Sequence, residues 1–253
     1  MKIWLIGAMV GFLLSCPLSN VSAQPKTQEA LTQSSEKMKV PILMYHSIGN
    51  DPSNELVILP QRFREEMSYL KKAGYTPIHF DQLEWRYGGG VLPAKPIIVT
   101  LDDGYEDNYR EGFPILKQTR MKATIFIITD VVNKPQRVTW EQMKEMQSTG
   151  IIEFGAHTKN HVDLKKSSQH VQHEEIEGSK QVLEAKLGKT VSAFAYPAGR
   201  YSPTTVQEVE NAGFSYAVTT KPGWAEPKQG LLTLHRVRIN GSLSLNAFKR
   251  MFP

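Results

Sequence analysis

The stretch Pro96-Ile97-Ile98-Val99-Thr100-Leu101, followed at once by Asp102-Asp103-Gly104, decides the fold class. A short strand that is apolar on both faces is typical of a parallel sheet covered by helices. Two adjacent carboxylates at the end of such a strand repel each other and lose hydration, which is costly without a compensating cation. Either they belong to a functional site, or they lie in a solvated loop and one of them caps the next helix.

Similar runs recur outward from this strand, and helical segments alternate with them. The predicted strands cover 40–45, 76–80, 97–101, 123–128, 152–155, 193–196, 216–219 and 234–239. The predicted helices cover 62–72 and 171–187, and two more begin near Thr139 and at Ser202-Pro203. This alternation implies parallel strands with right-handed crossovers. We therefore expect an α/β fold, a distorted (β/α) barrel of about seven parallel strands, in one domain over 40–253.

The start of the chain has the features of a secretory signal peptide over 1–23. Lys2 precedes an apolar run, and the small residues Ser22 and Ala23 come before an expected cut at Gln24. Cys16 lies in a lipoprotein-like context, but Pro17 directly after it disfavours lipid anchoring. Residues 24–39 are polar and are expected to form a flexible linker. We expect a secreted or cell-surface protein, monomeric and without a transmembrane helix in its mature form.

The bulk composition is that of an ordinary soluble globular protein. The 253 residues are 40% hydrophobic and 22% charged. The net charge of +5 and the pI near 9.1 fit anionic surroundings such as a cell wall. A nucleic-acid partner is not expected, because no basic stripe or recognition motif accompanies the charge.

A second polar motif also follows an apolar strand. His157-Thr158-Lys159-Asn160-His161 comes directly after the run Ile151-Ile152-Glu153-Phe154-Gly155-Ala156. Histidines at i and i+4 have a common metal-ligand spacing, although such a pair alone is more often solvated. In a barrel this motif and the Asp102-Asp103 step would meet at one rim. One aspartate and two histidines could hold a catalytic metal, and the other aspartate could accept a proton from water.

These motifs resemble those of the polysaccharide deacetylases with a NodB-type domain, carbohydrate esterase family four. Thr100 to Tyr105 is similar to the first motif of the family and His157 to His161 to the second. Phe194-Ala195-Tyr196-Pro197-Ala198-Gly199 and the opening Ile42-Leu43-Met44-Tyr45-His46 resemble the poly-N-acetylglucosamine deacetylase branch. The resemblance extends over the whole predicted domain and implies a TIM-barrel-related fold.

The resemblance also implies roles for individual residues. Asp102 would be the general base, and Asp103, His157 and His161 would hold a divalent metal, with zinc expected and cobalt or another ion as an alternative. The backbone N–H of Tyr196 would bind the oxyanion. Apart from the resemblance, Tyr105 and Trp224 are expected on rim loops, where they could stack on a sugar ring, and Pro197 would also contact the substrate. His46 ends the first strand and either donates a hydrogen bond from behind the metal site or is a structural histidine.

Two departures from the family pattern leave the proton donor open. No arginine shortly precedes Tyr196, and no aspartate follows Asp163. Leu232-Thr233-Leu234-His235-Arg236 partly resembles the last motif, so His235 is a candidate general acid and Arg236 a candidate for orienting the base. Alternatively, His235 takes the place of a proline that has no catalytic role.

Three functions remain in competition. The leading one is N-deacetylation of an extracellular or cell-wall polysaccharide built on N-acetylglucosamine, such as peptidoglycan, chitin-like oligomers or poly-N-acetylglucosamine. A catalytically impaired carbohydrate-binding protein on the same barrel is the alternative. A hydrolase of small amides or esters is disfavoured, because an exported enzyme is more simply explained by a polymer outside the cell.

Overall fold

The structure, a computed structural model, describes Met1, residues 39–83 and residues 92–253. The predicted signal peptide, Cys16 and all of the predicted linker except Lys39 therefore lie outside the described residues, apart from Met1. The chain divides into two units, Met1–Lys37 and Met38–Pro253, and every described helix and strand belongs to the second. No helix within the described ranges is long and apolar enough to cross a membrane.

Seven parallel strands close into a barrel. They are β1 (Ile42–Tyr45), β5 (Pro96–Leu101), β6 (Ala123–Ile127), β7 (Ile152–Ala156), β8 (Ala193–Ala195), β9 (Tyr216–Pro222) and β10 (Leu234–Arg238). The strand order is β1-β10-β9-β8-β7-β6-β5, and pairing of β5 with β1 closes the barrel. The short strand β4 (Thr76–Pro77) pairs in parallel with the first residues of β5. The predicted α/β barrel is confirmed. A separate parallel pair, β2 (Ser47–Ile48) and β3 (Val57–Ile58), was not predicted.

Side chains of the strands alternate between the barrel interior and the layer beneath the helices. Along β5, Ile97 and Val99 belong to the large outer core, whereas Ile98 belongs to the smaller inner one. The strand period of two puts Thr100 and Asp102 on the same face as Ile98. Asp102 consequently ends the inner column of this strand at the carboxyl-terminal rim.

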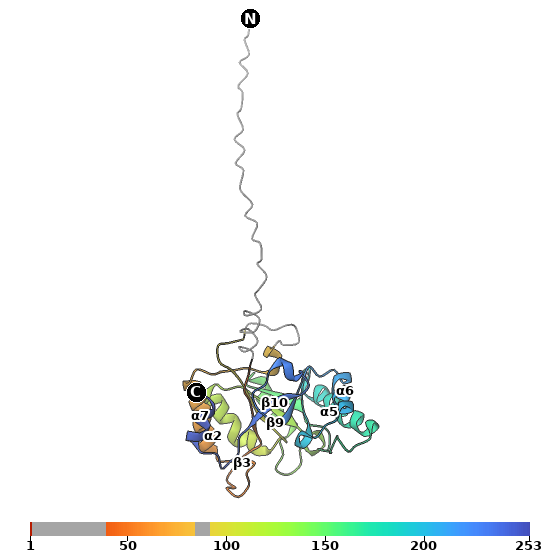
Figure 1. The fold of residues 1–253 in the computed structure, drawn as a ribbon, viewed down its shortest axis with the longest axis horizontal. Coiled ribbons are helices and arrows are strands. Elements are labelled where there is room, and N and C mark those ends of the chain that lie inside the picture. The colour runs from red at the N-terminus through yellow and green to blue at the C-terminus, as the bar shows by residue number, and fades with distance from the viewer. Residues whose placement is uncertain (2–38, 84–91) are drawn as a thin grey trace. The chain divides into compact units, whose positions relative to one another are not determined.

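Helices cover the outside of the barrel. They are α2 (Pro60–Lys72), α3 (Phe113–Thr119), α4 (Trp140–Ser148), α5 (Gln169–Leu187), α6 (Pro203–Asn211) and α7 (Leu245–Met251). Figure 1 shows α2 and α7 on one side of β9 and β10, and α5 and α6 on the other. Thr139 and Ser202 form the capping boxes of α4 and α6, and Gly188 ends α5 in the left-handed conformation, as their residue types predict. The seven-residue helices α3 and α7 were not predicted.

Candidate active site

Four of the predicted functional side chains converge at the carboxyl-terminal rim of the barrel. Asp102 and Asp103 follow β5 directly, His157 follows β7, and His161 lies in the loop that continues from it. Because all seven strands are parallel, their carboxyl ends open onto the same rim. Motifs separated in sequence by two strands and two helices are thereby brought into contact.

Asp103, His157 and His161 form a cluster that can hold one metal ion. Their ligand atoms all lie within 4.8 Å of one another. Oδ1 of Asp103 is 3.5 Å from Nε2 of His157 and 3.7 Å from Nε2 of His161. Two ligand atoms, each about 2.1 Å from a tetrahedral zinc ion, lie roughly 3.4 Å apart, so the spacing fits. The other ring nitrogen of His157, Nδ1, is 2.6 Å from the Ala195 carbonyl, the usual support for a metal-binding histidine.

The charges of this cluster favour an ionised carboxylate. Burial raises the pKa of Asp103, but the hydrogen bond and positive charge of His157 outweigh burial and hold it well below its usual range. Burial lowers the pKa of His161, with a further contribution from His157. His157 is buried, whereas 40% of the His161 side chain is exposed. The cluster therefore has one open side, as a site for water and substrate needs.

Several residues here adopt a backbone conformation that side chains normally disfavour. Asp103, Thr158 and His161 have φ angles of 76°, 62° and 58°. Gly104 follows at 67°, and a Cβ there would lie 2.9 Å from Cδ1 of Ile127. Left-handed residues other than glycine are uncommon and concentrate at functional sites. Such a conformation persists only where the surroundings hold it.

The buried carboxylate of Glu175 on α5 holds the loop between the two histidines. Its Oε2 accepts from the backbone N–H groups of Lys159 and Asn160 at 2.9 and 2.8 Å, and its Oε1 accepts from Nδ2 of Asn160 at 2.9 Å. His161 adds a bond of its own, from its N–H to the Thr158 hydroxyl at 2.9 Å. Sequence reasoning missed Glu175, because nothing in the spacing shows which face of the long helix meets this loop.

Arg137 supports the other side of the cluster. Its Nη1 donates to the carbonyl of Asp103 at 2.9 Å, and its guanidinium lies 4.2 Å from the ring centre of Tyr105. The next residue, Val138, donates from its backbone to Gly104 at 3.1 Å. The left-handed turn at Asp103 is thus clamped from outside the barrel. Arg137 was also missed, since it lies in a loop without a recognisable motif.

Asp102 is held by Arg236 from within the barrel. Nη1 and Nη2 of the arginine donate to the two carboxylate oxygens at 2.7 Å each. The guanidinium is itself fixed by bonds to the Thr219 carbonyl at 2.9 Å and the Thr100 hydroxyl at 3.0 Å. Burial raises the pKa of Asp102, but the charge and hydrogen bonds of Arg236 more than offset this and lower it. The contact agrees with the predicted partnership between Arg236 and the base.

His46 lies next to the same carboxylate, just after β1. Its Nε2 is 4.0 Å from Oδ2 of Asp102, which is too long for a hydrogen bond. Its carbonyl accepts from Nδ2 of Asn108 at 2.8 Å, which fixes the backbone here. Burial lowers the pKa of His46, although Asp102 and Asp103 pull it upward. Among the described residues, the His46 imidazole therefore lies next to Asp102 without a hydrogen bond to it.

The predicted oxyanion role of the Tyr196 amide does not fit the structure. This N–H donates to the carbonyl of Val218 at 3.2 Å, because Tyr196 continues β8 alongside β9. The hydroxyl of Tyr196 donates to Leu232 at 2.9 Å, inside the core. In the described part of the chain the N–H of Ala198, two residues on, makes no hydrogen bond, and Ala198 has a φ of 50°.

His235 and Trp224 do not join the rim cluster. Leu234 and Arg236 point into the barrel, so the strand period of two turns His235 outward. His235 instead lines a separate cavity together with Trp224. The prediction of His235 as a general acid is corrected by this alternation, and so is the prediction of Trp224 as a rim residue.

The other two predicted substrate contacts, Tyr105 and Pro197, follow the carboxyl ends of β5 and β8. Tyr105, whose one ring face is covered by Arg137, borders a cavity of about 430 Å³ that is also lined by Ser47, Asp51, Glu106, Asp107 and Arg110. Pro197 follows β8 and is buried. Tyr105 can therefore contact a ligand next to Asp103, whereas Pro197 offers little surface.

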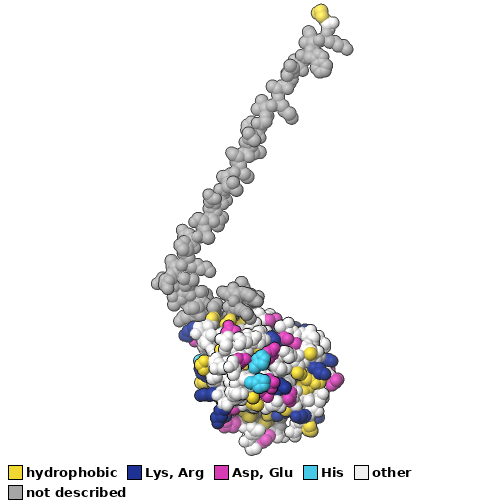
Figure 2. All heavy atoms as spheres, turned by 90° about the vertical axis from the view of Figure 1, so that its right-hand side faces the viewer, with side chains coloured by type: hydrophobic (Ala, Val, Ile, Leu, Met, Phe, Trp, Pro, Cys, Tyr) yellow, Lys and Arg dark blue, Asp and Glu magenta, His cyan; other side chains and the backbone are white. Residues whose placement is uncertain are grey.

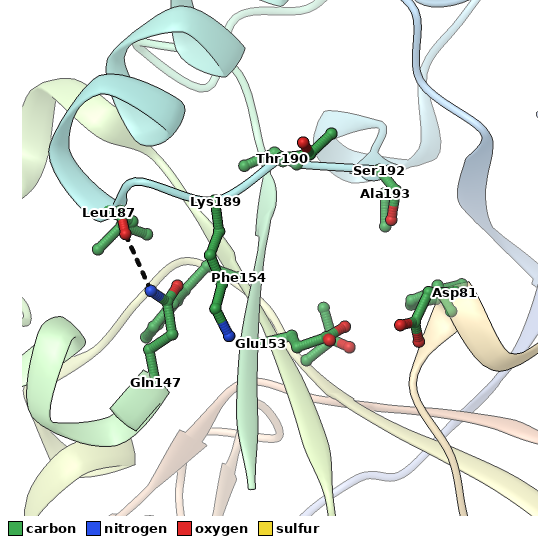
Figure 3. Close-up of a pocket in the computed structure, with 12 residues that line it drawn as sticks. Asp81, Gln147, Glu153, Phe154, Leu187, Lys189, Thr190, Ser192 and Ala193 are labelled. Atoms are coloured by element: carbon green, nitrogen blue, oxygen red, sulfur yellow. Dashed lines mark hydrogen bonds between the residues drawn. The ribbon is translucent and has the colours of Figure 1, made fainter. Parts of the chain in front are cut away.

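Charged side chains also gather away from the rim. At the amino-terminal mouth of the barrel, Figure 3 shows Asp81, Glu153 and Lys189 around one cavity of about 410 Å³. Burial raises the pKa of Glu153 to about 7. Figure 2, which views the side of α5 and α6, shows histidine side chains beside acidic and basic ones. On α5 the exposed His170 and His173 lie 3.6 and 3.1 Å from the carboxylates of Glu174 and Glu177.

Comparison with known proteins gives a consistent result. Residues 89–217 match the model of the family described as polysaccharide deacetylase. YxkH of Bacillus subtilis, named as a polysaccharide deacetylase, is 35% identical over 231 residues, which are 90% of this chain and 82% of that protein. The poly-beta-1,6-N-acetyl-D-glucosamine N-deacetylase of Staphylococcus epidermidis is 24% identical over 268 residues, covering 94% of this chain and 92% of the relative.

A solved structure has the same architecture. The deacetylase PplD of Streptococcus pyogenes, in complex with acetate, superposes with a TM-score of 0.80 at 35% identity. The match covers 85% of this chain and 98% of that one.

Proposed function

The chain belongs to the polysaccharide deacetylase family, and we propose that it is a secreted, metal-dependent enzyme acting on a glycan of N-acetylglucosamine. Membership of the family makes it a carbohydrate N-deacetylase, a hydrolase of carbon–nitrogen bonds other than peptide bonds. One observation carries the proposal: the three potential metal ligands lie beside an aspartate that a buried arginine holds in place.

The reaction breaks the amide bond and releases acetate and a free amine. Asp103, His157 and His161 would hold a divalent cation, which would supply the Lewis acidity for activating water and polarising the amide carbonyl. Asp102 accepts the proton of the attacking water, and Arg236 keeps both of its oxygens oriented and ionised. Zinc is our first choice, and cobalt or another divalent ion also suits these ligands.

The leaving amine needs a proton, and His46 is the residue we assign to this step. His235 faces away from the barrel interior, whereas His46 lies 4.0 Å from Asp102. Asp102 acts on the water that attacks the carbonyl carbon, and the general acid must protonate the nitrogen of the same amide bond. A residue close to Asp102 but not hydrogen-bonded to it can reach that nitrogen, and His46 is such a residue. The N–H of Ala198, which has no acceptor among the described residues, is our candidate for binding the oxyanion.

The proposed substrate follows from the relatives and from the start of the chain. The Staphylococcus epidermidis relative is named for poly-beta-1,6-N-acetyl-D-glucosamine, so this polymer is our first candidate, with peptidoglycan and chitin-like chains next. The apolar run and small residues of 1–23 support secretion, and 24–39 would tether the 40–253 domain. We propose a monomer, released by cleavage before Gln24 and without a lipid on Cys16.

Acetate release from the three purified polymers, with metal analysis of the same sample, tests the proposal. We expect about one divalent ion per chain and turnover on at least one polymer, both abolished in His157→Ala. A His157→Ala protein that keeps stoichiometric metal would refute the ligand set. Binding without any acetate release would favour the alternative, a catalytically impaired carbohydrate-binding protein.

A further inference from the structure

Trp224 and His235 line a cavity that is separate from the candidate active site and lies outside the barrel interior. We call it the Trp224 pocket; it has a volume of about 630 Å³, and its walls include Lys39, Trp224, Glu226, Lys228, Gln229 and His235. Nothing in the proposed reaction uses these side chains. Two of them are nevertheless residue types that commonly bind ligands, a tryptophan and a histidine.

The Trp224 pocket lies well below the catalytic rim. β10 pairs with β1 at Val237 and Leu43. His235 is two residues below this level and His46 three residues above it, so about five residues of strand, roughly 16 Å, separate the two levels. Together with the outward direction of His235, this height separates the pocket from the catalytic cluster.

The loop that carries the tryptophan is held firmly in place. Ala225 and Val40 exchange two backbone hydrogen bonds of 2.9 Å. The side chain of Gln229 donates to the Trp224 carbonyl at 2.9 Å and accepts from the backbone of His235 at 3.1 Å. The walls of the pocket are therefore formed before any ligand arrives, which lowers the entropic cost of binding.

Trp224 presents an apolar surface that the fold itself leaves uncovered. Its exposed fraction is 37%, and among the described residues it is the only aromatic side chain in the class of exposed large hydrophobics. The ring is surrounded by groups that form hydrogen bonds: the imidazole of His235, the carboxylate of Glu226 and two lysines. An aromatic face within a polar wall is the arrangement that small-molecule sites use to orient an amphipathic ligand.

A sugar ring fits this arrangement better than other ligands. One face of a pyranose consists of C–H bonds that can stack on an indole, and its edge carries hydroxyl and acetamide groups for polar partners. A polyanion is disfavoured, because Glu226 lies 3.9 Å from Lys39 and 3.2 Å from Lys228 and offsets their charge. A protein partner would need a larger apolar patch than one indole.

We propose that the Trp224 pocket is a secondary glycan-binding site that holds a distant part of the polymer being deacetylated. The proposal rests on the proposed function, since it takes the ligand to be an N-acetylglucosamine chain. Binding at two places on one long chain raises the local concentration of substrate at the catalytic rim. A short substrate cannot reach both places and gains nothing.

The test compares long and short substrates in the full-length protein. We expect Trp224→Ala to raise KM for the polymer about tenfold with kcat unchanged, and to leave both parameters unchanged for the disaccharide. Trp224→Phe keeps an aromatic face and should retain most of the polymer effect. Leu59→Ala, which removes another exposed apolar side chain (45% exposed), is the matched control and should behave as wild type.

Binding is measured separately in proteins that cannot turn over. Asp102→Asn should retain affinity for the long oligomer, and adding Trp224→Ala should weaken it about tenfold. Equal KM values for wild type and Trp224→Ala on the polymer would overturn the proposal. So would an equal loss on both substrates, which would put Trp224 in the catalytic cleft. If the wild-type protein releases no acetate but Trp224→Ala still binds the polymer more weakly, the proposed function is refuted and the glycan-binding site at Trp224 stands.

Discussion

The guanidinium of Arg236 holds both carboxylate oxygens of Asp102 at 2.7 Å, although the two residues are 134 positions apart. Both side chains are almost completely buried. A bidentate pair of this kind fixes the plane of the carboxylate as well as its charge. The arrangement keeps the proposed base ionised in a buried position where a carboxylate alone would take up a proton.

Replacement of Arg236 by lysine should therefore impair both catalysis and folding. Lysine keeps the charge but cannot donate to both oxygens, so the orientation of Asp102 is lost. We expect kcat to fall about 10–100-fold and the free energy of unfolding to fall by about 1–3 kcal/mol, the usual cost of leaving buried polar groups without their hydrogen-bond partners. The pKa of Asp102 should rise, which moves the acid limb of the pH–rate profile to higher pH.

The matched control is Arg238→Lys, at the exposed end of the same strand, which should change little. Activity and denaturant unfolding of the two variants supply the measurements. If Arg236→Lys retains wild-type kcat, the base does not depend on a bidentate partner.

Asp102 and Asp103 are adjacent, and asparagine variants should separate their roles. Asp103→Asn replaces an anionic ligand by a neutral one, so metal affinity should fall by about tenfold or more. Asp102→Asn should retain the metal and lose about 10²–10⁴-fold in kcat, because only the base is removed. Titration of each apoprotein with zinc, next to steady-state kinetics, distinguishes them. The reverse pattern would exchange the two assignments.

Features that depend on neighbouring residues in the sequence were predicted better than contacts between distant segments. All eight predicted strands exist, because continuous apolar runs and punctuating glycines are local signals. The strand ends predicted the rim position of Asp103 and His157 for the same reason. The short helices α3 and α7 were missed, since seven residues cover less than two turns of periodic pattern.

Interactions between distant segments were harder to predict. Arg236 was assigned through a resemblance, and the alternation of β10 explains why it points inward while His235 does not. Glu175 and Arg137 act through backbone groups of loops with left-handed residues, and no local pattern predicts such contacts. The Tyr196 amide was misassigned because its pairing with Val218 depends on how far β8 continues beside β9.

His46 and His235 give opposite expectations for the general acid. His46→Gln should lower kcat by about 10²–10⁴-fold while the polymer is still bound, because the leaving amine loses its proton donor. His235→Gln should leave kcat within about twofold of wild type, since its imidazole faces the Trp224 pocket. A substrate with a better leaving group should partly rescue His46→Gln. Should His235→Gln be the inactive variant instead, the outward position of His235 does not describe the working enzyme.

Glu175 should act as a positioning residue for His161. Glu175→Ala removes three hydrogen bonds that hold the loop in its left-handed conformation. We expect the affinity of the apoprotein for zinc to fall about 10–100-fold, the usual effect of losing support behind a metal ligand. Glu174→Ala, one residue earlier on the exposed face of α5, is the control and should bind zinc normally. Equal zinc affinities of the two variants would show that the loop holds its shape without Glu175.

Glu66, on α2, should make folding stability depend on pH. It is fully buried, its Oε2 accepts from the Tyr45 hydroxyl at 2.7 Å, and Oε1 has no partner among the described residues. Burial raises its pKa from 4.5 to about 8. Between these two values the folded protein binds a proton that the unfolded chain releases. The contribution of Glu66 is therefore complete below about pH 4.5 and is lost as the pH rises through about 8.

In this window the free energy of unfolding should fall by up to about 1.4 kcal/mol per pH unit because of Glu66. Glu66→Gln keeps an acceptor for Tyr45 and cannot ionise. The free energy of unfolding of this variant, relative to that of wild type, should therefore rise steadily between about pH 5 and about pH 8. Urea unfolding across this range measures the difference, and Glu65→Gln, on the exposed side of the same helix, should follow wild type. Parallel pH profiles for wild type and Glu66→Gln would mean that the folded protein keeps Glu66 ionised. The burial that raises its pKa would then be compensated by a cation, and the neighbouring Arg62, whose charge already lowers this pKa, would be the residue to change next.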